Sequence, residues 1–456
     1  MFGRRPIYTA AREITRENVV QELTSALNTH NLNRAEIQYL WDYYKGKQPI
    51  LQRVKEVRPE INNKIVMNIA YEAVSFAVAY LCGEPMQYVS REGREEISDK
   101  VIKLNSYMFD IDKAAQDQEV VEWMNICGTA YRLALPGEDT PLRLYTLDPR
   151  DTFVVYSADI GHKPLMAVVY YTDTDEVTRY SIYTETEFFE ISDTIIKTIK
   201  PHGLGGIPVF EYPANAARMG LFERCLSLLD AINTVESNRL DNVEAIVSAF
   251  IKFVNCDISA ADYEEFLKKG AIKVSSADGQ NADVDMVSTV LDQSQSQTLK
   301  DDMYNAVLRI CGMPSSSNAD SSASDTGQGV LLRNGWEHAE ARAKDSEHQF
   351  KKAERPMLKR CLHYLKDLGM LTLSAVDVDM KFTRRNYENI QSKAQVLDLM
   401  LNNPKIEPLL AFEHCGMFSD PEGAYKASMS YYDEYLKNWE PIDENVREDG
   451  RVPEEA

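Results

Sequence analysis

The chain has 456 residues, of which 44% are hydrophobic and 27% are charged. This is an ordinary globular balance that excludes wholesale disorder, and the length suggests about three folding units. The 71 acidic and 50 basic residues leave a formal net charge of −21, which argues against general adhesion to nucleic acid because such binding depends on cation–phosphate contacts.

The cysteines and the N-terminus bear on the compartment. The seven cysteines are scattered without a CxxC pair, which favours neither a disulfide framework nor a zinc site and fits a reducing compartment. The N-terminal MFGRRPIYTAAREITREN lacks the apolar core of a signal peptide. The longest apolar stretch, residues 73–83, is far shorter than the roughly 20 residues that span a bilayer. We therefore expect a soluble intracellular protein without a membrane segment.

The first part of the chain is predicted to be mostly helical. The expected helices cover residues 18–28 (or from the alternative cap Thr15), 33–44, 65–81 and 110–127. The third of these places apolar side chains every three or four positions, which is typical of an amphipathic helix, and Gly83 ends it. Gly128 ends the fourth.

Residues 129–213 change to short β-branched or aromatic runs separated by turn-forming segments. This pattern predicts an antiparallel sheet with helices before and after it. The expected strands are Tyr131–Leu135, Leu142–Thr146, Phe153–Tyr156, Met166–Thr172, Thr178–Tyr183 and Phe188–Ile191.

A long helix is expected over residues 221–254, roughly 50 Å at 1.5 Å per residue. A small mixed segment with a strand at 271–274 follows it, and helix returns over 297–311. The next segment, 313–329, reads MPSSSNADSSASDTGQG. It is too polar to bury a core of its own and, taken alone, is interpreted as a flexible linker.

The last third is again helical in pattern. A helix is expected over 330–368, with a kink or a restart at Pro356 because an interior proline removes a backbone hydrogen bond. Strand-like residues 372–382 and a helix over 390–401 come next, and the chain ends in a helical, acidic segment. The fold class predicted from these patterns is α+β, mainly helical.

Enzymatic motifs are absent or weak. The chain has no GxxxxGK[ST], HExxH or GxSxG motif, and we expect the GLGGIP run at 203–208 to be a turn between sheet and helix. Histidines 338, 348 and 363 lie on a charged helix and favour a solvated surface over a metal site. Three carboxylate pairs could in principle hold a divalent ion for nuclease chemistry, but 71 acidic residues produce such pairs by chance. They are Asp173/Asp175, Asp283/Asp285 and Asp377/Asp379. We predict no catalytic residue, no cofactor and no metal.

Short motifs in a fixed order resemble the portal proteins of tailed bacteriophages over roughly residues 35–370. They are Tyr43-Tyr44-Lys45-Gly46, Asn62-Asn63-Lys64, Asn68, Tyr80-Leu81-Cys82-Gly83-Glu84-Pro85, Gly128-Thr129-Ala130-Tyr131, Gly206-Ile207-Pro208, Asp230, Ser237, Gly312-Met313-Pro314 and 327–336. Each is weak alone, and the specificity comes from their order. One departure concerns the Ser-Gly-x-Ala-Leu-Lys run of many relatives, which here reads TGQGVLLR from Thr326 to Arg333. The basic residue is displaced, and Arg333 is the nearest candidate for it.

The resemblance implies a dodecameric ring at one capsid vertex of the virion, assembled in the host cytoplasm, with double-stranded DNA passing through its channel during packaging and ejection. It also implies partners: the terminase large subunit, head–tail adaptor proteins, and the major capsid and scaffolding proteins. The implied parts are an N-terminal arm (1–29), a wing (30–220), stem helices (221–254 and 297–312), a small α/β clip (255–296), a tunnel loop (313–328), a kinked channel helix (329–369), and a helical crown with an acidic tail (370–456).

The resemblance assigns residues to three of these parts. The DNA-facing residues of the tunnel loop and its flank would be Ser315, Ser316, Ser317, Asn318, Ser321, Ser322, Ser324, Thr326, Gln328 and Arg333. The residues of the clip at which the motor docks would be Asp257, Tyr263, Lys268, Lys269 and Lys273. Pro356 would kink the channel helix, whose basic side chains could face DNA or equally form a solvated or subunit-pairing surface.

Physical arguments from the sequence agree with a ring. One chain of this length cannot encircle duplex DNA, and closed rings are built from head-to-tail interfaces. Negative charge multiplied around a ring would keep DNA sliding. Two alternatives remain: a structural or scaffold protein of another large assembly without DNA passage, and a metal-dependent nuclease.

Overall fold

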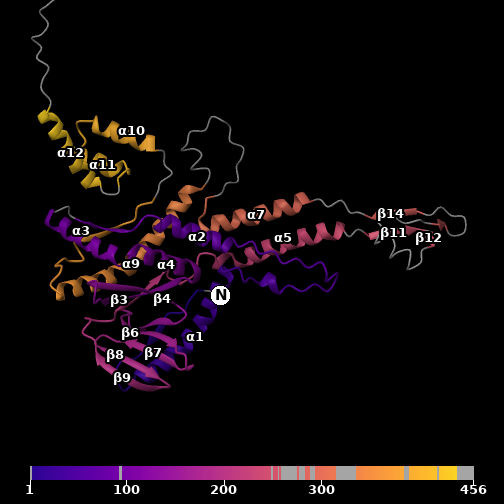
Figure 1. Ribbon diagram of the computed structural model, residues 1–456, viewed down its shortest axis with the longest axis horizontal. Coiled ribbons are helices and arrows are strands. Elements are labelled where there is room, and N and C mark those ends of the chain that lie inside the picture. The colour runs from indigo at the N-terminus through magenta and orange to yellow at the C-terminus, as the bar shows by residue number, and fades with distance from the viewer. Residues whose placement is uncertain are drawn as a thin grey trace, which may run out of the picture.

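The computed structural model describes residues 3–91, 95–247, 250–254, 256–257, 275–276, 283–287, 293–314, 335–384, 390–418 and 421–438. The fold is α+β. Figure 1 shows a body of helices and sheets, a projection of two long helices that leaves the body on one side, and a small group of C-terminal helices.

The helices of the body agree in part with the predictions. They are α1 (Val19–Tyr44), α2 (Ile69–Cys82), α3 (Glu95–Asp110), α4 (Lys113–Cys127) and α9 (Trp336–Asp367). The prediction of two helices within 15–44 is wrong, because Asn33 does not cap a new helix. Its buried side chain instead exchanges hydrogen bonds with the backbone N–H and C=O of Arg5, at 2.9 and 2.8 Å.

The helix predicted over 110–127 begins later than expected, at Lys113, and α3 precedes it. Asp112 separates the two helices with a left-handed φ of 50°. Gly128 ends α4 with a φ of 83°, as predicted; its Cα lies against the backbone of Arg218, so a side chain there would collide with it. The helix predicted over 65–81 begins at Ile69, since residues 63–67 lie extended against another helix.

The six predicted strands are all confirmed, but they belong to two sheets rather than one. The first sheet has the order β1-β5-β6-β7-β8-β9 and the second the order β10-β3-β4. The strands are β1 (Ile7–Thr9), β3 (Thr129–Pro136), β4 (Leu142–Leu147), β5 (Thr152–Ser157), β6 (Pro164–Thr172), β7 (Thr178–Tyr183), β8 (Glu187–Ser192), β9 (Ile195–Pro201) and β10 (Val209–Pro213). The expectation of a purely antiparallel sheet is also wrong, because β1 from the N-terminal arm pairs with β5 in parallel. The GLGGIP run is a turn, but it joins β9 to β10 and not a sheet to a helix.

The projection contains α5 (Leu226–Val247), which follows a 3-10 turn η2 (Glu223–Cys225), and α7 (Gln293–Cys311). The helix predicted over 221–254 is too long. It ends at Val247, and Phe250–Val254 forms strand β11, whose alternating aromatic and β-branched residues suit a strand. β11 pairs antiparallel with β14 (Asp283–Val287), and β12 (Cys256–Asp257) pairs with β13 (Ser275–Ser276). The strand predicted at 271–274 lies outside the described residues.

The C-terminal elements follow α9. β15 (Val378–Lys381) pairs with β2 (Gln87–Ser90), and α10 (Ile390–Leu401) matches its predicted bounds. α11 (Pro408–His414) and α12 (Pro421–Asn438) complete the group. α9 continues through the exposed Pro356, so the helix does not restart there, while the kink stays a prediction. Within the described ranges, no helix combines the length and the apolar character needed to cross a bilayer.

Candidate assembly surface and channel elements

The projection has a buried base and an exposed outer part. α5 and α7 lie side by side and antiparallel (Figure 1). At the base, their apolar side chains pack with α1, α2 and α4 in one buried cluster that includes Leu229, Ile232, Val307 and Leu308. Farther out, apolar side chains are exposed: Leu240, Val243 and Leu299. Apolar surface on a protruding element is typical of a contact with a partner.

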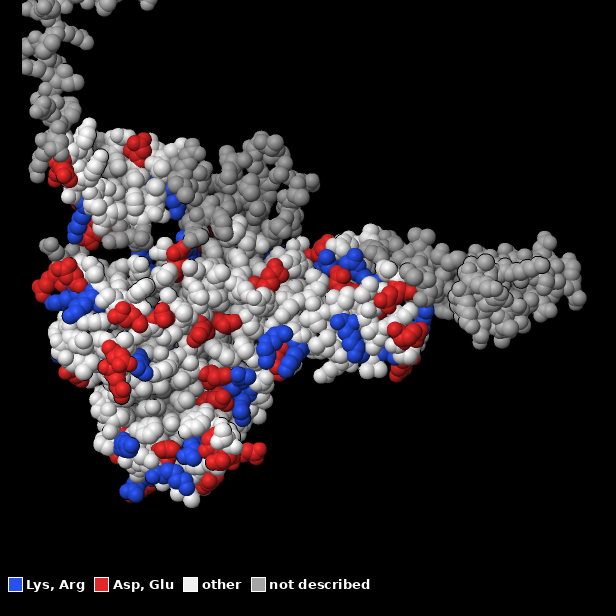
Figure 2. All heavy atoms as spheres, viewed as in Figure 1, with Lys and Arg blue, Asp and Glu red and all other residues white. Residues whose placement is uncertain are grey.

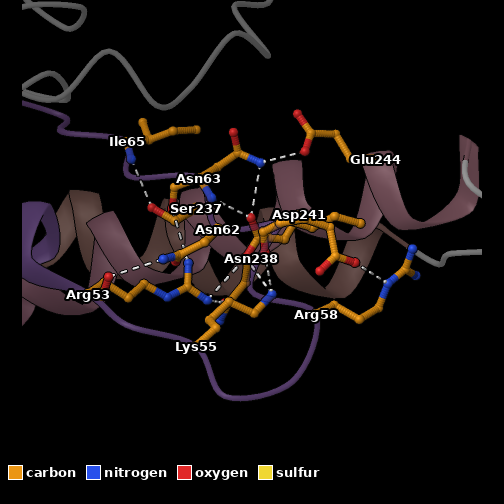
Figure 3. A network of polar contacts seen from close by, with 12 residues as sticks. Arg53, Lys55, Arg58, Asn62, Asn63, Ile65, Ser237, Asn238, Asp241 and Glu244 are labelled. Carbon is orange, nitrogen blue, oxygen red and sulfur yellow. Dashed lines mark hydrogen bonds and ion pairs between the residues drawn. The ribbon is translucent and has the colours of Figure 1, made fainter.

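An extended segment, residues 63–67, lies along α5 (Figure 3). Three of its backbone N–H groups, two residues apart, donate to three buried α5 side chains that are four residues apart. These bonds join Asn63 to Asp241 Oδ1 at 2.7 Å, Ile65 to Ser237 Oγ at 3.0 Å and Met67 to Asn233 Oδ1 at 2.8 Å. Two residues of extended chain rise about 6.6 Å and four residues of helix rise about 6 Å. The two repeats therefore match, and the segment runs antiparallel to α5. We call these three hydrogen bonds the polar ladder.

Two cations bind Asp241, the acceptor at the outer end of the polar ladder. The buried carboxylate of Asp241 also accepts from Lys55 Nζ at 2.9 Å and lies 3.2 Å from Arg53. Burial alone would raise the pKa of the Asp241 carboxyl, but the hydrogen bonds from Asn63 and Lys55 outweigh burial and hold that pKa below its usual range. Arg53 also donates to Asn238 of α5. The loop between α1 and α2 is thus fixed to α5 by both neutral and charged contacts.

Several motif residues behind the family resemblance meet beside this ladder. Tyr43 donates to Asp230 of α5 at 2.9 Å, and Asn68 donates to the Tyr44 carbonyl at 2.8 Å. Sequence reasoning identified Asn63 and Ser237 but missed Asn233 and Asp241. The available signal was the polar stripe of positions 233, 237 and 241, four residues apart on one face of a helix that otherwise has an apolar stripe.

We expect Asp241→Ala to loosen the loop. The substitution removes an acceptor of one backbone N–H and two cations, and a hydrogen bond to a charged group contributes about 1.5–3 kcal/mol. Hydrogen exchange of the Asn63 and Ile65 amides should accelerate in the variant. Asn242→Ala, at the neighbouring exposed position, is the control and should leave the exchange unchanged. Equal protection of these amides in Asp241→Ala and in the wild type would contradict a role for the ladder.

A second buried network fixes α9 to the body. Glu354 of α9 lies 2.8 Å from Lys113 Nζ and 3.3 Å from Arg132, and Tyr88 donates to it at 2.7 Å. Asp117 of α4 pairs with the same two cations, each at 2.7 Å. All four charged side chains are buried. Burial alone would raise the pKa of the Glu354 carboxyl, but Lys113 and Arg132 lower it, and the net shift is to about 2. Lys113 and Arg132 therefore hold the Glu354 carboxylate in its charged form.

The described residues on either side of the predicted tunnel loop contact helices α2 and α9. Gly312 adopts a φ of 71°, and a Cβ at this position would lie 3.0 Å from the Arg342 side chain of α9. The Trp336 ring lies 5.9 Å from the Tyr80 ring and 6.2 Å from the Phe76 ring, both of α2. Both ends of the segment between residues 314 and 335 are therefore anchored at the junction of these two helices.

The structure places few of the predicted site residues. Outside the described residues lie Ser315, Ser316, Ser317, Asn318, Ser321, Ser322, Ser324, Thr326, Gln328, Arg333, Tyr263, Lys268, Lys269 and Lys273. Asp257 belongs to strand β12, and Pro356 lies in α9, two residues after the buried Glu354.

Ion pairs occupy part of the basic face of α9. Lys351 lies 2.6 Å from Glu347 one turn away, and Lys344 lies 3.7 Å from Glu340. Arg384, from the segment after β15, bridges both carboxylates at 2.9 and 2.8 Å. This arrangement favours a paired surface over a free cationic one on this side of α9. Figure 2 likewise shows acidic and basic side chains interspersed over the described part of the face in view.

Asp173 and Asp379, from two of the three carboxylate pairs considered for metal chemistry, have structural contacts. Asp173 accepts from the backbone N–H of Asp175 and Val177 and from Arg179, and so shapes the turn between β6 and β7. Asp379 lies 3.8 Å from Arg355. The part of the chain that the structure describes has no cluster of three or more His, Cys, Asp or Glu residues placed to hold a metal ion.

One family model matches most of the chain. The model of the family described as phage portal protein, SPP1 Gp6-like, matches residues 24–447. A solved structure of the neck of an empty GTA particle, computed with C6 symmetry, is similar with 12% identity and a TM-score of 0.44, over 76% of this chain and 90% of that chain. No curated protein matches the sequence. The family match covers most of the chain, including the residues of the polar ladder and the whole projection, and the chain therefore belongs to the SPP1 Gp6-like phage portal protein family.

Proposed function

We propose that the chain forms a closed ring, of 12 subunits, at one vertex of a phage capsid, and that this ring is the conduit for DNA during packaging and ejection. The observation that carries the proposal is the projection, whose outer apolar side chains Leu240, Val243 and Leu299 are exposed in a single chain. Neighbouring copies in a ring would cover such surface. The net charge of −21 fits a channel wall along which DNA slides without adhering.

The finer assignments follow the family. The stem would be the α5–α7 projection, and the clip (255–296) would receive the terminase large subunit and later the head–tail adaptors through Asp257, Tyr263, Lys268, Lys269 and Lys273. The tunnel loop (313–328) would face DNA between the described residues Gly312 and Trp336, which contact α9 and α2. Major capsid and scaffolding proteins would hold the ring in the virion. The chain itself would supply no catalysis, so a separate motor would move the DNA.

The first test is assembly. Light scattering of the purified protein should give a mass of many subunits, and electron microscopy should show rings with a central hole of about the width of duplex DNA. A well-folded monomer at high concentration would contradict the proposal. Rings without a hole of that width would favour a scaffold protein that passes no DNA.

The second test concerns the tunnel loop. We expect Ser316→Lys with Ser322→Lys to leave rings intact and to reduce the DNA packaged per capsid, because added cations attract phosphate. Ser106→Lys with Ser374→Lys, at exposed positions of the body, adds the same charge elsewhere and should leave packaging unchanged. Full-length packaging at the wild-type rate in the loop variant would contradict DNA contact by this segment.

A further inference from the structure

The loop between α1 and α2 exposes two valines at its tip. Val54 is 84% exposed and Val57 is 77% exposed, although aliphatic side chains of this kind are usually buried. They follow the short 3-10 helix η1 (Pro49–Gln52) and lie in residues 51–60, which we call the loop tip.

The loop tip is held in one conformation. Lys55 donates to the Ile61 carbonyl at 2.9 Å, and Asn62 donates to the Arg53 carbonyl at 3.1 Å, so the two strands of the loop are joined across its neck. The polar ladder then fixes the second strand to α5. A preorganised surface loses little conformational entropy when it binds, which increases the affinity for a partner. The loop tip therefore exposes the two valines as a rigid apolar surface.

A second apolar surface lies on the other helix of the projection. Leu299 and Ile310 of α7 are 53% and 41% exposed. In Figure 1 the loop tip lies along one side of α5 and α7 lies along the other, and α5 contacts both η1 and α7. The two segments that carry these exposed apolar side chains thus lie on opposite sides of α5.

This placement suits a head-to-tail contact between copies. An isologous dimer uses the same patch on both subunits, whereas a ring needs two different patches on opposite sides of each subunit. One pair of exposed charges is complementary: Glu56 in the loop tip and Arg309 beside Ile310 on α7, while the exposed Asp302 lies one turn from Leu299. Opposite charges at the edge of an interface favour the correct pairing.

We propose that the loop tip of one copy docks through Val54 and Val57 on the exposed face of α7, at Leu299 and Ile310, of the neighbouring copy. The inference rests on the proposed ring and names the two surfaces that close it. The partner is a second copy of this chain, and the contact repeats around the ring.

The proposal is tested with charged substitutions on each surface. Val54→Asp with Val57→Asp, and separately Leu299→Asp, should each raise the protein concentration at which half the chains are in rings by about tenfold or more. At a concentration where the wild type and the variants are all monomeric, far-ultraviolet circular dichroism and the unfolding temperature should be the same, since the side chains are exposed in the single chain. The matched control is Ile160→Asp in the turn between β5 and β6, an exposed apolar residue of the body, which should assemble like the wild type.

Mixing the two variants separates this contact from other interfaces. The Leu299→Asp chain keeps an intact loop tip, and the Val54→Asp/Val57→Asp chain keeps an intact α7. At a concentration where each variant alone is monomeric, the mixture should form a 1:1 heterodimer in sedimentation velocity, because only one of the two surfaces on each chain can pair.

Three outcomes would count against specific claims. If the wild type forms rings and both variants form rings equally well, the loop–α7 contact is wrong, and the proposed function still stands. A Leu299→Asp chain that forms dimers by itself, without the other variant, would overturn the head-to-tail arrangement in favour of a loop–loop contact. A monomeric wild-type chain would overturn the proposed ring itself.

Discussion

Glu354→Gln is expected to lower the free energy of unfolding of the body by about 3–5 kcal/mol, the range found when one partner of a buried ion pair is removed. The substitution keeps the shape of the side chain, so no cavity forms. In the variant, Asp117 is the carboxylate of this network that still pairs with Lys113 and Arg132. Two cations then face one carboxylate, so the buried site carries a net positive charge. It also weakens the acceptor of the Tyr88 and Tyr212 hydroxyls. Urea unfolding followed by circular dichroism measures the effect.

A control and a compensating change make this prediction specific. Glu337→Gln, at an exposed position in the first turn of α9, removes the same charge and should shift the transition by less than about 0.5 kcal/mol. Arg132→Met added to Glu354→Gln restores neutrality around Lys113 and Asp117. The double variant should therefore lose less stability than the two single losses combined, because residues in one network are not additive. A Glu354→Gln transition within the range of the Glu337→Gln control would show that the network contributes little.

Strands β3 to β8 could be predicted from the sequence because each is a short run of β-branched and aromatic residues between turn-forming segments, whereas β1, β9 and β10 were missed. Their division into two sheets could not be predicted. The parallel strand β1 has three residues, and its position depends on contacts far away in the sequence. Arg4 pairs with Glu223 at 2.6 Å, both side chains being buried, and Asn33 binds the backbone of Arg5. No sequence pattern within residues 3–9 predicts these distant contacts.

Residues 63–67 show why local patterns mislead at the site. Their apolar side chains continue the helical spacing of α2, and this predicted a helix from residue 65. The hydrogen bonds that keep the segment extended come from Asn233, Ser237 and Asp241, about 170 residues later. The polar stripe on α5 is visible in the sequence but was not identified, and nothing in the sequence names its partner. The tunnel-loop and clip residues depend on the family resemblance, and their roles stay predictions.

Acidification is expected to destabilise the six-stranded sheet through His30 before most of its carboxylates are protonated. The imidazole is stacked on Phe153 at 4.4 Å between ring centroids and lies 2.9 Å from the Arg150 carbonyl and 3.1 Å from the Tyr170 hydroxyl. Burial lowers the pKa of His30 from 6.5 to about 4; the hydrogen bond to Arg150 opposes this shift, and the positive charge of Arg34 adds to it. Between these two pH values the unfolded chain binds a proton that the folded chain does not. The contribution of neutral His30 to the free energy of unfolding is therefore fully present above pH 6.5 and is lost as the pH falls towards 4.

The size of the loss follows from the shift. A difference of about 2.5 pKa units corresponds to about 3 kcal/mol at the acidic end of the window. Other groups titrate in the same range, so the measurement is the difference between the wild type and His30→Gln, which retains a hydrogen-bond donor for the Arg150 carbonyl but does not titrate. Urea unfolding at pH 7 and at pH 4.5 should show a larger loss of unfolding free energy for the wild type than for the variant. Hydrogen exchange should show that the amides that lose protection are those of β5 and β6, where Phe153 and Tyr170 pack on α1. If both proteins lose the same stability over this interval, the His30 proton is not responsible, and the acid sensitivity of the sheet must come from its carboxylates.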